Sequence, residues 1–200
     1  MPRPEFFRLH DLFIEDDFID SAACEQIRKR IRAVESNSGT VFGSDPANEV
    51  VNEKLRKVLR AKVEKETVAW VSEQLQNLKP RLEEHFRLSL SGFEKPSFLR
   101  YDEGAFYTPH RDSSGEDDAL KRRISVVIFL NAPSKNPEPD CYGGGLLTFY
   151  GLLSQPPFDK CPLPLEAESG LLVGFRSNIL HEVRPVTFGQ RFTIVTWFHT

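Results

Sequence analysis

The sequence is poor in cysteine. Its 200 residues include only three cysteines, Cys24, Cys141 and Cys161, and no Cys-x-x-Cys pair. So few scattered thiols exclude a disulfide framework and provide no zinc-binding or redox motif. We interpret all three as free thiols.

Long hydrophobic runs are also absent. No apolar segment of the chain approaches the roughly 20 residues that cross a bilayer. Residues 1–11 carry charges and two prolines where a secretory signal needs a continuous apolar segment. We therefore expect no membrane partner and a cytoplasmic location. The formal net charge of −3 provides no general field to attract nucleic acid, so no nucleic-acid partner is expected. The oligomeric state is left open.

What the sequence does contain is typical of a globular α+β protein. With 40% hydrophobic and 28% charged residues, the 200-residue chain fits one domain with a sizeable core. We expect residues 1–95 to form a mostly helical support region and residues 96–200 to form a β-rich core that carries the functional site.

Two helical patterns are expected in the first half. Asp20 and Ser21 offer an N-cap to a helix whose apolar residues recur from Cys24 to Val34. A second helical region is expected from Val51 through Trp70 to Leu78, ending at Pro80. Between them, Ser36–Pro46 has the composition of a loop.

The second half contains short runs rich in β-branched and aromatic residues, separated by loops with glycine and proline. We expect strands at Phe98–Tyr101, Ile124–Leu130, Leu146–Tyr150, Leu171–Phe175 and Phe192–Phe198. The proline-rich segments Ala132–Asp140 and Gln155–Pro164 are expected to be surface excursions within this β unit.

His110-Arg111-Asp112 contains two potential metal ligands, two residues apart. On an extended strand both side chains would project from the same face. His181, which precedes a strand-like run, is the best candidate for a third ligand. Two histidines and one carboxylate leave three positions of an octahedral metal open, as in non-haem Fe(II) oxygenases. Taken alone, the short motif also fits a strand with a surface histidine and a turn aspartate. The other histidines, His10, His85 and His199, are interpreted as structural or exposed.

Arg191 begins the last expected strand, and Thr193 shares its face. A guanidinium and a nearby hydroxyl suit the distal carboxylate of 2-oxoglutarate, whose other end would chelate the metal. A surface salt bridge is the alternative for Arg191. Tyr101 and Trp197 could line the same pocket, although aromatic residues on strands are commonly part of the core.

A family resemblance rests on these residues together with several glycines. The sequence resembles the prolyl-4-hydroxylase-like branch of the iron/2-oxoglutarate dioxygenases from about residue 96 to the end, and Leu12–Ile31 is similar to the family's entry strand and first helix. The residues that carry the resemblance are Phe98-Leu99-Arg100-Tyr101, Gly104, Tyr107, His110-Arg111-Asp112, Phe129-Leu130-Asn131, Gly143-Gly144-Gly145-Leu146, Gly170, Gly174-Phe175, His181-Glu182-Val183, Pro185-Val186, Gly189, Arg191 and Trp197.

The resemblance implies a double-stranded β-helix, or jelly-roll, core with N-terminal flanking helices. It implies that His110, Asp112 and His181 bind Fe(II) as the catalytic centre and that Arg191 binds 2-oxoglutarate. Thr193, Tyr101 and Trp197 are expected beside the cosubstrate. O2 would be consumed, succinate and CO2 released, and ascorbate is a candidate reductant. The reaction implied is hydroxylation of an unactivated C–H bond.

The sequence departs from the family pattern at Phe129. Some peptidyl-prolyl hydroxylases have a hydroxyl-bearing residue near this position that helps to bind the keto acid, and Thr193 is expected to substitute for it. The presence of Asp112 argues against the halogenating relatives, which replace this carboxylate with a small residue. The absence of a second arginine after Arg191 argues against the nucleic-acid-demethylating branch. Glu182 is expected to face away from the metal, without a catalytic role.

The substrate stays open between several classes. A prolyl or other peptidyl residue is favoured, and a free amino acid or other small molecule is the alternative. A non-catalytic metal-binding β-sandwich protein is the third possibility. The loops Ser36–Pro46, Ser113–Leu120 and Ala132–Tyr142 are expected to rim the opening.

Overall fold

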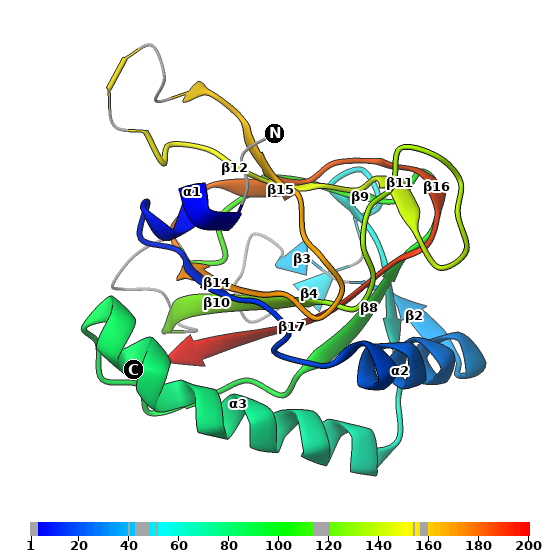
Figure 1. The fold of residues 1–200 in the computed structure, drawn as a ribbon, viewed down its shortest axis with the longest axis horizontal. Helices are drawn as coiled ribbons and strands as arrows, with labels where there is room; N and C mark the ends of the chain where they lie inside the picture. Colours follow the sequence, from blue (N-terminus) through cyan, green and yellow to red (C-terminus); the bar gives the residue numbers. More distant parts are fainter. Residues whose placement is uncertain are drawn as a thin grey trace.

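The computed structural model describes residues 4–39, 41–42, 49–50, 52–113, 121–153, 155–156 and 160–200. Its strands form two antiparallel sheets that face each other (Figure 1). The major sheet contains, in spatial order, β1 (Phe13–Glu15), β14 (Leu172–Arg176), β10 (Arg122–Phe129), β17 (Arg191–His199), β8 (Ser97–Tyr101), β6 (Leu59–Ala61) and β2 (Ser36–Ser38), with β7 (Gly92–Phe93) also paired to β17.

The minor sheet lies across from it. It contains, in spatial order, β13 (Leu163–Leu165), β12 (Leu147–Phe149), β15 (His181–Val183), β9 (Phe106–His110) and β5 (Arg56–Lys57). Two smaller pairs join β11 (Tyr142–Gly144) to β16 (Val186–Gly189) and β3 (Val41–Phe42) to β4 (Glu49–Val50). The expected jelly-roll core is thereby confirmed.

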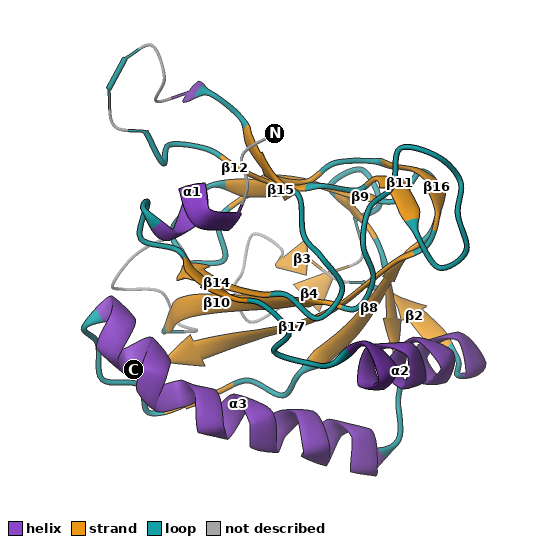
Figure 2. Cartoon of the chain, viewed as in Figure 1, coloured by secondary structure: helices purple, strands orange, loops and turns teal. Residues whose placement is uncertain are grey.

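The two longer helices cover the outer face of the major sheet (Figure 2). These are α2 (Ser21–Ala33) and α3 (Lys65–Phe86). The short α1 (Pro4–Arg8) precedes β1 and lies away from both (Figure 2). Apolar residues at helical spacing, such as Leu75 and Leu82 of α3, are fully buried in one cluster with Phe198 of the sheet. Burial of this apolar surface holds the helices against the outer face of the sheet and leaves its inner face to line the space between the two sheets.

In strand β17, alternate residues face the two sides of the major sheet. Phe192, Ile194 and Phe198 belong to the cluster beneath the helices. Residues at the alternate positions, Arg191 and Thr193 among them, line a cavity between the two sheets. Because side chains alternate along a strand, the helix-facing aromatic and aliphatic residues orient the functional ones inward.

The first expected helix is confirmed as α2. The Asp20 side chain caps it by accepting a 2.8 Å hydrogen bond from the backbone N–H of Ala23. Ile27 and Ile31 are buried, as the apolar spacing predicted.

The second helical prediction was wrong at both ends. Leu55 and Val58 lie in and around the short strands β5 and β6, because this segment pairs with β8 and β9, and the helix begins only at Lys65. Val51 lies outside the described residues. Pro80 is inside α3 rather than at its end. It is exposed, so water can bond the backbone carbonyl that its missing N–H leaves free.

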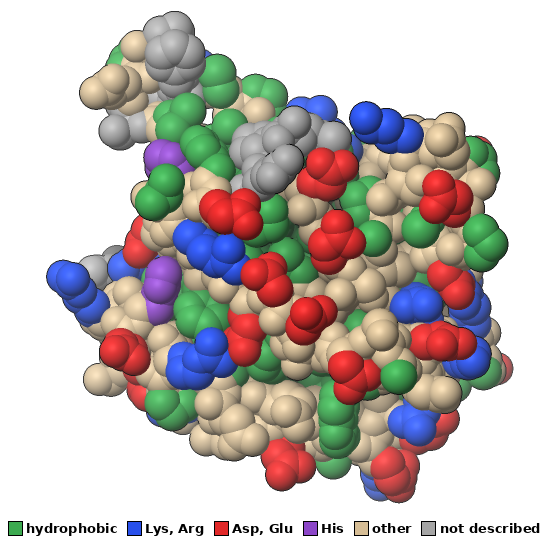
Figure 3. Space-filling view, viewed as in Figure 1, with side chains coloured by type: hydrophobic (Ala, Val, Ile, Leu, Met, Phe, Trp, Pro, Cys, Tyr) green, Lys and Arg blue, Asp and Glu red, His purple; other side chains and the backbone are tan. Residues whose placement is uncertain are grey.

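The expected loop Ser36–Pro46 was also partly wrong, because β2 and β3 form within it, and residues 40 and 43–46 lie outside the described residues. All five strands expected in the second half are present within a few residues of the expected bounds. The excursion from 132 to 140 is mostly exposed, and β13 forms at the end of the second proline-rich segment. On the face drawn in Figure 3, acidic and basic side chains are interspersed. The division at residue 95 stays a prediction, and residues before it contribute strands to both sheets.

Candidate active site

His110, Asp112 and His181 converge at one end of the cavity. The two histidines are paired neighbours in the minor sheet, at the end of β9 and the start of β15. Nε2 of His110 lies 3.6 Å from Oδ1 of Asp112, and Nε2 of His181 lies 3.4 Å from its Oδ2. One ligand atom from each residue lies within 4.8 Å of the others. This spacing suits one metal ion bound on three sides.

Each imidazole ring is oriented by the backbone. Nδ1 of His110 is 2.8 Å from the carbonyl oxygen of Thr108, and Nδ1 of His181 is 2.9 Å from that of Ile179. With the proton on Nδ1 donated to these carbonyls, Nε2 of each ring presents its lone pair toward Asp112. Hydrogen bonds of this kind fix the tautomer of histidines that bind metals.

Asp112 lies two residues beyond the end of β9, not within the strand as expected. Its backbone N–H donates to the carbonyl oxygen of Ser177 at 2.9 Å, which holds the residue in place without strand pairing. The Ser125 hydroxyl donates to Oδ2 at 2.7 Å. Burial opposes ionisation of Asp112, but the neighbouring His181 and His110 and the Ser125 bond outweigh it, so the pKa of the carboxyl lies well below its usual range.

His181 is buried, and its ring forms a T-shaped pair with Phe175 at a centroid distance of 4.8 Å. Burial lowers the pKa of this histidine to about 4, against the attraction of Asp112. At neutral pH the site therefore offers one carboxylate and a neutral imidazole. His110 is covered on one side by Tyr107, whose ring stacks on it at 3.5 Å.

The cavity extends from these residues to Arg191. Its walls include Tyr101, Thr193, Trp197 and Arg191, so the structure brings all four residues expected at the cosubstrate into the same cavity as the three candidate ligands. Trp197 is held by Arg122, whose guanidinium carbon lies 3.8 Å from the ring centroid. His10, His85 and His199 are outside the cluster.

Arg191 is only 1% exposed, yet no carboxylate in the described part of the chain forms an ion pair with it. Its Nη1 donates to Oγ1 of Thr193 at 3.4 Å, and its Nε has no hydrogen-bond partner. The expected alternative of a surface salt bridge is therefore wrong. A buried guanidinium without a counterion inside a cavity is a site for an anionic ligand, because burial of an uncompensated charge is costly.

Sequence comparison identifies the family. The model of the 2OG-Fe(II) oxygenase superfamily matches residues 96–199, which contain all three candidate ligands and Arg191. The chain belongs to this superfamily. This is the superfamily that the resemblance implied.

Curated relatives of this oxygenase include PKHD-type hydroxylases. One from Acidovorax ebreus is 33% identical over 110 residues, covering 52% of this chain and 43% of the relative. Another from Alteromonas mediterranea is 29% identical over 110 residues, with coverage of 52% and 43%. The oxygenase thus matches less than half the length of these relatives.

Solved structures show the same fold along the whole chain. A Pseudomonas putida prolyl-4-hydroxylase aligns with a TM-score of 0.70 and 24% identity, covering 98% of this oxygenase and 95% of that chain. A prolyl hydroxylase from Trichoplax adhaerens, solved with a peptide fragment of hypoxia inducible factor, aligns with a TM-score of 0.72 and 19% identity, covering 100% and 94%. The oxygenase therefore has the fold of the prolyl-4-hydroxylase-like branch.

Three side chains of the site were not singled out from the sequence as functional. Ser125 is the one polar residue in the run Ile124–Leu130, a pattern that could have indicated a bond into the cavity. Tyr107 was quoted only as part of a motif. Tyr142, at the end of a proline-rich segment, is fully buried, and Arg191 lies close enough to act on the pKa of its phenol.

The loops expected to rim the opening contribute little to the described cavity. Most of Ser36–Pro46 and nearly all of Ser113–Leu120 lie outside the described residues, and no residue of 132–142 lines the cavity. Glu182 bonds to the hydroxyl of Tyr150 at 2.6 Å, apart from the three-residue cluster. In the described part of the chain, no helix is both long and apolar enough to cross a membrane.

Proposed function

We propose that this oxygenase binds Fe(II) through His110, Asp112 and His181 and 2-oxoglutarate through Arg191, and hydroxylates a prolyl or other peptidyl residue. The observation that carries the proposal is the buried guanidinium of Arg191, which has no counterion among the described residues and lies in the cavity that contains the three candidate ligands. Two imidazole nitrogens and a carboxylate are a donor set that suits Fe(II) and leaves positions open for other ligands.

When bound, Fe(II) supplies oxidative decarboxylation of 2-oxoglutarate by O2, coupled to C–H hydroxylation, with release of succinate and CO2. The residues of the chain provide the surroundings for this chemistry. Arg191 holds the distal carboxylate by parallel hydrogen bonds, and the hydroxyl of Thr193, fully buried beside it, adds another polar contact.

The aromatic residues of the cavity position the reactants and exclude water. Tyr101 packs against the Arg191 guanidinium, with 5.0 Å between the ring centroid and Cζ. Tyr107 covers the cavity beside His110, and Trp197 lines the same cavity. Burial, despite the nearby Arg56, raises the pKa of Tyr107 to about 12, so its hydroxyl stays a neutral donor at physiological pH.

A peptidyl substrate is favoured because the solved Trichoplax adhaerens relative carries a peptide and because hydroxylases recur among the relatives. Ascorbate is proposed as a reductant that maintains activity over repeated turnovers. Free amino acids and other small molecules are alternative substrates that the same assay separates.

The test is succinate formation by protein loaded anaerobically with Fe(II), after addition of O2 and 2-oxoglutarate. Parallel reactions contain proline-containing peptides, other peptides or free amino acids, each with and without ascorbate. We expect peptide-stimulated succinate formation and a mass increase of one oxygen in the peptide. If free amino acids but no peptides stimulate succinate formation, the substrate is a free amino acid and the peptidyl assignment is wrong. Absence of both iron binding and decarboxylation under every condition would overturn the proposed function.

A further inference from the structure

The guanidinium of Arg191 is enclosed by rings as well as by hydroxyls. Its Cζ lies 5.0 Å from the ring centroid of Tyr101 and 5.2 Å from that of Phe129. Phe129 has no hydroxyl to offer, and the bond from Arg191 to Thr193, at 3.4 Å, is long. These contacts leave the direction of the guanidinium weakly specified.

Tyr142 supplies the missing polar contact. It is 1% exposed, and its phenol lies close enough to the Arg191 guanidinium for that charge to act on its pKa. It is not among the residues that line the cavity. Burial raises the pKa of its phenol, against the attraction of Arg191, so the hydroxyl remains neutral at physiological pH.

The packing around this pair leaves little room for movement. At Gly145, where φ is +57°, an added Cβ would lie 3.1 Å from Cδ of Arg191 and 3.2 Å from Cδ2 of Tyr142. The backbone of this glycine therefore lies directly against both side chains. A larger residue would displace them and would be strained by the positive φ.

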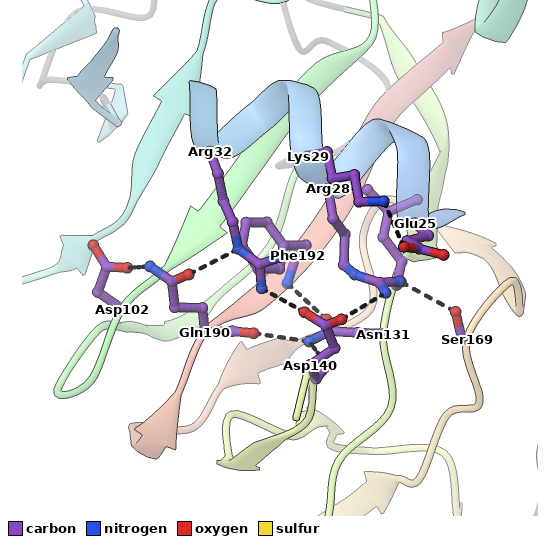
Figure 4. A network of polar contacts seen from close by, with 11 residues as sticks. Glu25, Arg28, Lys29, Arg32, Asp102, Asn131, Asp140, Ser169, Gln190 and Phe192 are labelled. Carbon is purple, nitrogen blue, oxygen red and sulfur yellow. Dashed lines mark hydrogen bonds and ion pairs between the residues drawn. The ribbon is translucent and has the colours of Figure 1, made fainter. Parts of the chain in front are cut away.

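The backbone segments that carry the pair are joined by Asn131 (Figure 4). Its Nδ2 donates to the carbonyl oxygens of Gln190 and Asp140, each at 2.8 Å, and its Oδ1 accepts from the N–H of Phe192 at 2.9 Å. Asn131 thus binds the residues on either side of Arg191 and the segment that leads into Tyr142.

Helix α2 reinforces this connection from outside. Arg32 donates to Oε1 of Gln190 at 3.2 Å and to Oδ1 of Asp140 at 2.8 Å (Figure 4). The same network therefore fixes the strand end that carries Arg191 and the loop end that carries Tyr142.

We propose that Tyr142 is a positioning residue that directs the Arg191 guanidinium toward the distal carboxylate of 2-oxoglutarate, in place of a hydroxyl at Phe129. The inference rests on the proposed function, in which Arg191 binds this carboxylate. It assigns the polar contact missing at Phe129 to Tyr142 in addition to Thr193.

The test compares two keto acids on Fe(II)-loaded protein under anaerobic conditions. One is 2-oxoglutarate, and the other is 2-oxobutanoate, which has the same metal-chelating end but no distal carboxylate. In Tyr142→Phe, which removes only the hydroxyl, we expect the affinity for 2-oxoglutarate to fall about tenfold, as for loss of a hydrogen bond to a charged group. Affinity for 2-oxobutanoate should be unchanged.

Thr196→Val is the matched control. It removes a buried hydroxyl from β17, the strand that carries Arg191. The hydroxyl donates a 2.6 Å bond to the carbonyl oxygen of Glu94. The control should leave the ratio of the two affinities at the wild-type value. Equal weakening of both keto acids by Tyr142→Phe, or no weakening of either, would overturn the positioning role.

A second variant tests the substitution for Phe129 directly. Adding Phe129→Tyr to Tyr142→Phe should restore the preference for 2-oxoglutarate, and failure to restore it would overturn the claim that Tyr142 takes the place of a hydroxyl at position 129. Arg191→Ala separates the two levels of inference. If Arg191→Ala leaves the ratio of affinities unchanged, the proposed role of Arg191 fails. If only Tyr142→Phe leaves it unchanged, the positioning role alone fails.

Discussion

The Ser125 hydroxyl donates a 2.7 Å hydrogen bond to Oδ2 of Asp112, the same oxygen that lies 3.4 Å from Nε2 of His181. Ser125 belongs to β10 of the major sheet, whereas Asp112 follows β9 of the minor sheet. One hydroxyl therefore fixes the candidate carboxylate ligand across the space between the sheets.

Ser125→Ala should lower the affinity for Fe(II) about 10- to 100-fold, because partners of this kind orient the groups that bind a metal. Anaerobic titration with Fe(II) measures the effect, and far-ultraviolet circular dichroism should be unchanged. Ser177→Ala is the control. It removes a hydroxyl 3.0 Å from Ser125 Oγ but leaves the bond from Ser125 to Asp112, so its affinity for Fe(II) should stay near the wild-type value. A Ser125→Ala variant with wild-type affinity would show that Asp112 is oriented by its backbone alone.

Asp112→Ala should abolish Fe(II) binding and hydroxylation while the protein stays folded, because the change removes a buried charge and a ligand together. Metal content after desalting and the thermal unfolding midpoint measure the two effects. Glu182→Ala is the acidic control beside His181 and should retain iron. Iron retained by Asp112→Ala would contradict the ligand assignment.

Arg191→Ala should raise KM for 2-oxoglutarate by about 100-fold or more, as expected when one partner of a buried charge pair is lost. Fe(II) affinity should change little. The KM of Arg191→Lys for 2-oxoglutarate should lie between the values of the wild type and Arg191→Ala, because lysine keeps the charge but not the paired donors. Arg184→Ala, which changes a half-buried arginine next to β15, is the control. Equal loss of iron and 2-oxoglutarate affinity in Arg191→Ala would count against the assigned role.

Asp140→Asn should destabilise the protein at neutral pH but not in acid. The bond from Arg32 is the main cause that lowers the pKa of Asp140 below its ordinary value in the folded protein. Between the folded and unfolded pKa values the unfolded chain binds more protons, so this stabilisation is present above about pH 4 and is lost as the pH falls further. The half-exposed ion pair contributes about 1 kcal/mol or less, and added salt should weaken it.

Urea unfolding of wild type and Asp140→Asn at pH 7 and pH 3 measures this linkage. Glu25→Gln, which removes another ion pair of α2 but leaves the Asn131 network intact, provides the comparison. A difference between wild type and Asp140→Asn that is the same at both pH values would refute the linkage.

Leu75→Ala should reduce the free energy of unfolding by about 2–5 kcal/mol, since a fully buried leucine is replaced by a cavity. Trp70→Ala, at a 40% exposed position of the same helix, should cost far less. Chemical denaturation measures both. Similar losses for the two variants would show that α3 does not support the sheet through its buried face.

Where local pattern and tertiary structure agree, the sequence was a reliable guide. The alternation from Arg191 to Phe198 predicted both the strand and the shared face of Arg191 and Thr193, because a strand has a fixed period of two. The N-cap at Asp20 was equally predictable, because its partner is only three residues away.

The misses depend on distant partners. Residues around Leu55 form strands because β8 and β9 offer edges to pair with, and nothing local encodes those edges. Pro80 fits within α3 because it faces solvent. Tyr142 has the local composition of a loop end, and its contact with Arg191 arises only when β11 pairs with β16 just before β17 begins.

The pairing of His110 with His181 also bears on how the protein resists unfolding. The two residues are far apart in sequence, so their ring nitrogens lie close together only when β9 and β15 are paired in the minor sheet. A cation bound between them would act as a removable cross-link that the unfolded chain cannot form. By mass action it would select the closed state, and a chelator would then lower the resistance of the whole β-core to heat and proteolysis.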